Sequence, residues 1–241
     1  MSFKSKYMVP IMVLTAMMGI VSCRDNYKRQ ITIADSLSVN DPHAAVRYTD
    51  SLLKHHSSEM SKAERMKVAL LELKSKNTAM IPFYPSGMLT DIVDYYDKNG
   101  DNNDRMMSLY ILGSAYLKQG NNDLALDNYQ KAIYIAENSS SNGNLWLIAR
   151  LHAHVSDLLY WQADTRGAMC ENNKACHYAW LDKDTLYAIS SYEQNANFYT
   201  DLGMLDSAVL IRLEANKLFL KYGYRKDGVT CKSVWIRHRF S

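Results

Sequence analysis

The chain has 241 residues and a formal net charge of +3, with 47% hydrophobic and 22% charged residues, a balance typical of a folded chain and not of a disordered one. Its 10 glycines and 4 prolines are too few for a large all-β protein, so helices are favoured. Much of the positive charge lies near the two ends, and no predicted helix carries a basic stripe. A nucleic-acid partner is therefore not expected.

Residues 1–22 are predicted to be a secretory signal. Lys4 and Lys6 precede an uncharged apolar run of roughly 14 residues, which is shorter than the ~20 residues that span a bilayer. The run ends in Ile20-Val21-Ser22-Cys23, which resembles the lipobox of bacterial lipoproteins. The resemblance implies cleavage before Cys23 and its acylation with diacylglycerol and a further fatty acid such as palmitate. The alternative is an ordinary signal peptide with a coincidental cysteine.

This anchor predicts a place in the cell envelope, on the outer membrane or a periplasmic face rather than in the cytoplasm, because several acyl chains on one residue give stable anchoring. Residues 23–29 would form a lipidated linker.

Residues 30–100 are predicted to form degenerate helical hairpins. Asp41-Pro42 is typical of an N-cap followed by a first-turn proline, and it predicts a helix over 43–55. Ser61 and Glu64 have the spacing of a capping box, which predicts that a helix begins there. A further helix over 88–98 should end at Asn99-Gly100, so the acidic run that follows is interpreted as a linker and not as a calcium loop.

The clearest pattern covers residues 106–139. Apolar residues recur at helical intervals, a glycine marks a close helix contact, a second glycine ends the first helix, and small residues alternate with a ring on a second helix. The pattern resembles the tetratricopeptide repeat, whose period is about 34 residues. It is carried by Leu109, Leu112, Gly113, Tyr116, Gly120, Ala125, Tyr129 and Ala132.

Weaker copies follow within residues 101–222, around Ala168 and Ala175 and around Ala208 and Ala215. The repeat step is longer than the family norm, and we expect extra turns at 139–144 and 183–184 to absorb the excess. The predicted fold is all-α: about ten helices in antiparallel pairs, stacked as a right-handed solenoid like that of tetratricopeptide proteins. Residues 223–241 lose helical periodicity and are predicted to form an irregular basic tail.

A closer resemblance, to tetratricopeptide lipoproteins of the Bacteroidetes type, covers most of the mature chain. It rests on short motifs: 34–37, 42–53, 69–76 and 94–96. Members of that group often continue into a transmembrane helix and a coiled coil or DNA-binding end, neither of which is present here. The basic, aromatic last stretch is consistent with a truncated or frame-shifted end.

No cluster of residues typical of catalysis is found, so we expect no enzymatic activity, no cofactor and no metal site. His152 and His154 diverge on one helix and are interpreted as part of a solvated polar face. Cys170 and Cys176 fall on different helix faces and are interpreted as small, partly buried side chains. Four Asp-Ser/Thr-apolar triplets, which begin at Asp35, Asp50, Asp184 and Asp206, resemble Bacteroidetes O-glycosylation sites, but helix caps and solvent-facing positions are the favoured interpretation.

In the tetratricopeptide family the first helix of each pair lines a concave groove, and this resemblance implies a set of partner-binding residues. Aromatic and arginine side chains favour binding, so Tyr110, Arg150, Tyr160 and Trp161 are the predicted anchors. Packing between helices is at least an equal alternative for Tyr160 and for Trp161. The predicted groove residues are Tyr110, Ser114, Lys118, Arg150, Asp157, Tyr160, Trp161, Glu193 and Asn197.

The leading functional hypothesis is a membrane-tethered scaffold that binds a protein or peptide, and the resemblance admits a role in signalling or regulation. The alternative is a glycan- or nutrient-binding outer-membrane lipoprotein.

Overall fold

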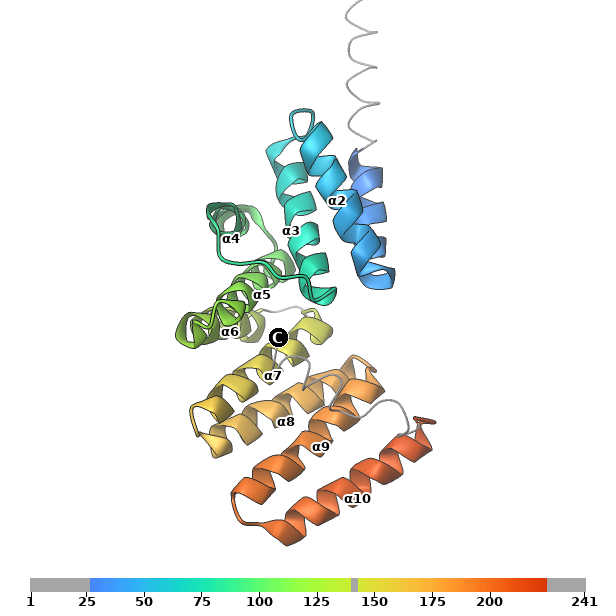
Figure 1. Ribbon diagram of the computed structural model, residues 1–241, viewed down its shortest axis with the longest axis vertical. Coiled ribbons are helices and arrows are strands. Elements are labelled where there is room, and N and C mark those ends of the chain that lie inside the picture. Colours follow the sequence, from blue (N-terminus) through green and yellow to red (C-terminus); the bar gives the residue numbers. More distant parts are fainter. Residues whose placement is uncertain (1–26, 140–142, 225–241) are drawn as a thin grey trace, which may run out of the picture. The chain divides into compact units, whose positions relative to one another are not determined.

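The structure, a computed structural model, describes residues 27–139 and 143–224, and every regular element in these ranges is an α-helix (Figure 1). The predicted all-helical, helix-pair fold is confirmed. The predicted signal, Cys23 and the tail from residue 225 lie outside the described residues. Within the described ranges no helix has the length and hydropathy needed to cross a bilayer. The chain divides into two compact units, one up to Tyr95 and one from Tyr96 on.

The first unit consists of a helix that runs to residue 40, α2 (Pro42–His56), α3 (Lys62–Thr78) and most of α4 (Gly87–Asn99). The predicted caps are present. The Asp41 side chain accepts a hydrogen bond from the backbone N–H of Ala44, and Ser61 and Glu64 form a reciprocal capping box. These bonds satisfy backbone donors that the first turn of a helix leaves without partners.

The core of this unit joins α2, α3 and the preceding helix. Tyr27, Leu52, Met60 and Val68 form one buried cluster, and burial of such side chains is the main stabilising term. The Tyr27 hydroxyl also donates a hydrogen bond to the carboxylate of Glu59.

The second unit contains three helix pairs: α5 (Asn102–Lys118) with α6 (Asn122–Glu137), α7 (Leu145–Trp161) with α8 (Thr165–Leu181), and α9 (Thr185–Asp201) with α10 (Leu205–Lys221). Each helix packs against the next one along the chain, and Figure 1 shows them running back and forth.

The repeat step is longer than ~34 residues because the helices themselves are long. Helices α7 to α10 have 17 residues each and begin at residues 145, 165, 185 and 205. The expected extra turn at Lys183-Asp184 is therefore wrong: that connection has the same length as the connections on either side of it.

The turns that follow α5, α7, α8, α9 and α10 share one conformation. In each of these turns a residue with positive φ follows the helix: Gly120, Ala163, Lys183, Gly203 and Gly223. The next N–H then bonds to a carbonyl five residues back, as in Asn121 N to Tyr116 O at 2.9 Å and Asp164 N to Leu159 O at 2.9 Å. This pattern is the Schellman motif, which satisfies the last carbonyls of a helix.

Small side chains set the distance between paired helices, as the sequence pattern predicted. A Cβ atom on Gly113 would lie 2.6 Å from Cε1 of Tyr129, so only glycine fits at this contact. In the second pair Ser156 occupies the corresponding place, and its hydroxyl donates to the carbonyl of Ala168 at 2.7 Å. Ala125, Ala132, Ala168, Ala175, Ala196 and Ala215 are fully buried.

Candidate functional site

The predicted groove residues lie on α5, α7 and α9, the first helices of the three pairs in the second unit. Tyr110 contacts α7, and Arg150 and Tyr160 contact α9. Ser114 instead contacts Tyr129 on α6, and Asn197 contacts Arg212 on α10. We call this set of predicted residues the first-helix face. It is defined by Tyr110, Ser114, Lys118, Arg150, Asp157, Tyr160, Trp161, Glu193 and Asn197.

Tyr110 and Ser114 belong to the interior edge of this face. The Tyr110 ring meets the rings of Tyr129, Trp146 and His154 at centroid distances of 6.0, 6.5 and 5.6 Å, and only 6% of the residue is exposed. The buried Ser114 hydroxyl donates to the Tyr110 carbonyl at 2.9 Å and lies 3.2 Å from the hydroxyl of Tyr129 on α6. Both residues thus join α5 to neighbouring helices. Tyr110 has little exposed surface that a binding partner could contact.

Arg150 is held in place by two aromatic rings and one carboxylate. Its guanidinium carbon lies 3.3 Å from the centroid of the Tyr187 ring and 5.4 Å from that of Trp146, a cation–π arrangement. Its Nη2 is 3.2 Å from Oδ2 of Asp184, which also caps α9. Burial raises the pKa of Tyr187, and the positive charge of Arg150 opposes that rise. The result is a guanidinium of fixed orientation between α7 and α9.

Tyr160 and Trp161 end α7 and differ in accessibility. The Tyr160 ring packs edge-on against Phe198 with centroids 5.3 Å apart, and its hydroxyl donates to the Asp201 carboxylate. Trp161 is 44% exposed, the largest exposed aromatic surface among the predicted anchors that the structure describes. Trp161 is therefore the anchor most available to a partner.

The remaining predicted residues are charged or polar. Lys118 is exposed as a residue, yet desolvation of its ammonium group lowers the pKa of Lys118 to about 8. The negative charge of Asp157 acts on the hydroxyls of both Tyr129 and Tyr187. Asn197 is exposed and accepts a hydrogen bond from Arg212 at 3.1 Å, and Glu193 is half-buried.

The prediction of a solvated face for the two histidines is wrong for His152, which is only 1% exposed. Its Nδ1 lies 2.6 Å from Oε2 of Glu171 on α8, and its ring stacks on Tyr178 at 5.4 Å. His154 is half-buried and stacks on Tyr129 at 5.0 Å. Helix α7 packs against helices on several sides, so a polar residue on it is buried and paired rather than solvated.

Sequence reasoning also missed Trp146, Asp184 and Tyr187, which surround Arg150. Trp146 lies four residues before Arg150, a spacing that places two side chains on one helix face and could have indicated their contact. Asp184 and Tyr187 lie on the next pair, so their approach depends on how α9 packs against α7.

The cysteines and the possible glycosylation triplets add no reactive cluster. Cys170 is exposed, contrary to the expected partial burial, and Cys176 is half-buried, with its thiol 3.3 Å from the Ala188 carbonyl. Burial raises the pKa of the Cys176 thiol. Asp184 caps a helix, and Asp50 is exposed to solvent within α2, as expected for caps and solvent-facing positions. The described residues contain no group of three or more potential metal ligands.

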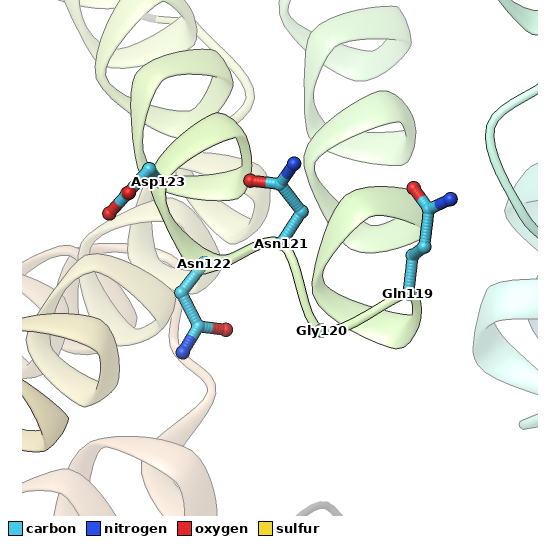
Figure 2. A pocket seen from close by; sticks show the side chains of 5 residues that line it. All are labelled: Gln119, Gly120, Asn121, Asn122 and Asp123. Carbon is cyan, nitrogen blue, oxygen red and sulfur yellow. The ribbon is translucent and has the colours of Figure 1, made fainter.

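Figure 2 shows an open hollow at the turn between α5 and α6, lined by Gln119, Gly120, Asn121, Asn122 and Asp123. Asn121 caps α6 by accepting from the backbone N–H of Leu124 at 3.1 Å. The hollow is thus a product of the turn and is separate from the ring contacts of the first-helix face.

Comparison with known proteins agrees with the repeat assignment. Residues 107–139 match the family model of the tetratricopeptide repeat, which confirms the repeat predicted over 106–139. Curated proteins give no match to this chain.

Solved structures with a similar fold include the nearly identical TPR-like repeats of a Podosopora anserina kinesin light chain, with a TM-score of 0.58, 13% identity, and coverage of 82% of this chain and 96% of that chain. BtubC from P. vanneervenii gives a TM-score of 0.52, 16% identity, and coverage of 85% and 77%. The structure of MamA gives a TM-score of 0.50 and 19% identity, and the match covers 79% of this chain and 96% of that chain. At these identities the likeness concerns the fold alone. Residues 107–139 thus contain a tetratricopeptide repeat, and the described part of the chain has the fold of helix-pair repeat structures.

Proposed function

We propose that the chain is a lipid-anchored scaffold of the bacterial cell envelope that binds a protein or peptide partner on its first-helix face. The observation that carries the binding site is the fixed orientation of Arg150 between Trp146 and Tyr187, with the exposed Trp161 at the other end of α7. Arginine and tryptophan are enriched at binding hot spots, and side chains that are already held in place lose less entropy on binding.

The charge of the face favours a polar, elongated partner. Asp157 and Glu193 supply negative charge, while Lys118 and Arg150 supply positive charge, so neither sign dominates. A peptide that combines apolar side chains with charges of both signs fits this surface better than a strongly acidic or basic one. The fold and the repeat match support a protein ligand over an oligosaccharide.

Paired alanine variants test the binding face. Trp161→Ala removes an exposed aromatic side chain from α7. Tyr134→Ala is the control: it removes an aromatic side chain that is 67% exposed on α6, the second helix of its pair. We expect Trp161→Ala to weaken binding of the partner by roughly 30-fold, as loss of a hot-spot residue does, and Tyr134→Ala to leave binding unchanged.

The partner is first identified by photo-crosslinking from position 161 in intact cells, followed by mass spectrometry. Equal crosslinking from positions 161 and 134 would refute the assignment of the face. Binding to oligosaccharides with no protein captured would refute the scaffold.

The anchor is proposed from the lipobox resemblance alone. Cells grown with an alkyne-labelled fatty acid should incorporate it into the chain, and Cys23→Ser should abolish both the label and recovery in the membrane fraction. Cys170→Ser, on the exposed side of α8, is the matched control and should keep both. An unlabelled wild-type chain in the soluble fraction would contradict the proposal and would leave the partner-binding test unaffected.

A further inference from the structure

Helix α10 carries an apolar surface that nothing in the described part of the chain covers. Its inner side, which includes Ala208, Ala215 and Phe219, packs against α9. Its outer side exposes five aliphatic residues to more than half of their surface: Leu205 61%, Val209 56%, Leu210 66%, Leu213 53% and Leu220 75%. Large apolar patches on a surface mark interaction sites.

Four of these residues form one stripe. At 100° per residue, Leu205, Val209, Leu213 and Leu220 fall within a band of about 80°, and Leu210 lies roughly 60° beyond its edge. The opposite edge of the band borders the side that contacts α9, and the band extends over nearly the whole of α10. A stripe of this spacing is the surface by which one helix packs along another.

Charged residues beside the stripe indicate what covers it. Asp206 lies near the beginning of α10, and Lys217 and Lys221 lie near its end, all along the same edge of the band. If two α10 helices pack antiparallel, Asp206 of one faces the lysines of the other, and symmetry creates this contact twice. A parallel two-fold pair would place these edges on opposite sides of the interface, so the contact between Asp206 and the lysines would be absent.

We propose that the outer face of α10 is the docking surface for a second copy of this chain, paired antiparallel about a two-fold axis at Leu213. This surface meets the first-helix face at Arg212, which donates a hydrogen bond to Asn197. A single helix pair buries less than the ~1,200 Å² of a stable complex, so the dimer is reversible and depends on concentration.

Residues 225–241 are a less suitable occupant. They contain five arginines and lysines against one aspartate, and the edge of the stripe already carries two lysines against one aspartate. A second copy offers better complementarity than a basic segment.

Cysteine crosslinking of the full chain in intact cells tests the proposal. The native Cys170, Cys176 and Cys231 are replaced, Leu213→Cys is introduced, and a short bismaleimide is added. The two-fold axis at this position predicts a strong dimer band. Leu205→Cys should give little crosslinking, because in an antiparallel pair the two copies of this residue lie at opposite ends. Tyr134→Cys, an equally exposed position on α6, is the background control.

Charge reversal tests the complementarity. Asp206→Lys should lower the yield of the Leu213→Cys crosslink severalfold, and the further changes Lys217→Asp and Lys221→Asp should restore it. A chain that ends at Tyr224 should crosslink as well as the full chain. The proposal is overturned by a yield at position 213 no higher than at 134, by equal yields at 205 and 213, or by crosslinking seen only after residues 225–241 are removed.

Discussion

Gly113 determines how closely α5 and α6 approach. We predict that Gly113→Ala destabilises the second unit by about 1–3 kcal/mol, because the added methyl overlaps the fully buried ring of Tyr129. Alanine gains up to ~1 kcal/mol in helix propensity, which offsets only part of the cost. Denaturant unfolding followed by circular dichroism measures the change.

Gly87→Ala is the matched control, since a Cβ at that position meets nothing within 4 Å. A Gly113→Ala chain as stable as the Gly87→Ala chain would mean that Tyr129 moves aside freely.

Glu171 provides a pH dependence at the interface of α7 and α8. Burial acts to raise its pKa, but hydrogen bonds with His152 and Lys174 outweigh burial, so the net pKa of Glu171 is lowered. A carboxylate with a lowered folded-state pKa stabilises the protein above its unfolded pKa, and this contribution is lost as pH falls through the folded value. We therefore predict that part of the stability is lost below about pH 4.5.

Melting temperatures measured from neutral to acid pH test this prediction. Glu171→Gln should lower the melting temperature at neutral pH. It should also reduce the fall in melting temperature between neutral and acid pH, which we call the acid limb. Asp127→Asn, which removes an exposed ion pair with Lys131, should change neither, because surface pairs contribute little. An unchanged acid limb in Glu171→Gln would rule out this carboxylate as a source of acid sensitivity.

At the scale of the element, the turns of the second unit differ in one detail. Asn121, Asp164 and Asp184 each cap the following helix with a side-chain oxygen, whereas Met204, with a similar backbone conformation, makes no such bond to α10. We predict that Met204→Asp stabilises the chain by about 1 kcal/mol, the usual contribution of a helix cap.

The comparison variant Met204→Ala removes the same exposed side chain without adding an acceptor. It should leave the melting temperature close to that of the unaltered chain, while Met204→Asp raises it. Equal melting temperatures for the two variants would show that the backbone at 204 cannot present a cap.

The caps and turns also show which features of the fold could be predicted from the sequence. Caps such as Asp41 and Ser61, and the turn glycines Gly120 and Gly203, were predictable because each depends on residues close in sequence. Ala163 and Lys183 adopt the same positive φ without glycine, so composition gave no signal there. The environment of Arg150 was not predictable either, since it depends on how α9 packs beside α7.

At the scale of the whole molecule, burial is uneven along the second unit. Nine residues of α7 are buried against three of α10. In repeat proteins each helix pair is stabilised mainly by its neighbours, so local opening is easiest where neighbours are few. We predict that amide hydrogen exchange is slowest in α7 and fastest in α10.

Mass spectrometry of deuterated fragments measures this order. Dilution should speed exchange in α10 further if a second copy covers it, and should not affect α7. Uniform exchange across α5 to α10 would instead indicate that the second unit unfolds as one cooperative block.

The repeated turn has a consequence for how such a chain evolves. The turns after α7 and α8 close through bonds between the helix that ends there and the cap that begins the next one. These local bonds would be copied intact with a duplicated helix pair. The contacts of Arg150 with Asp184 and Tyr187 depend instead on which pair follows, so lengthening the array at Asp184 has to preserve them.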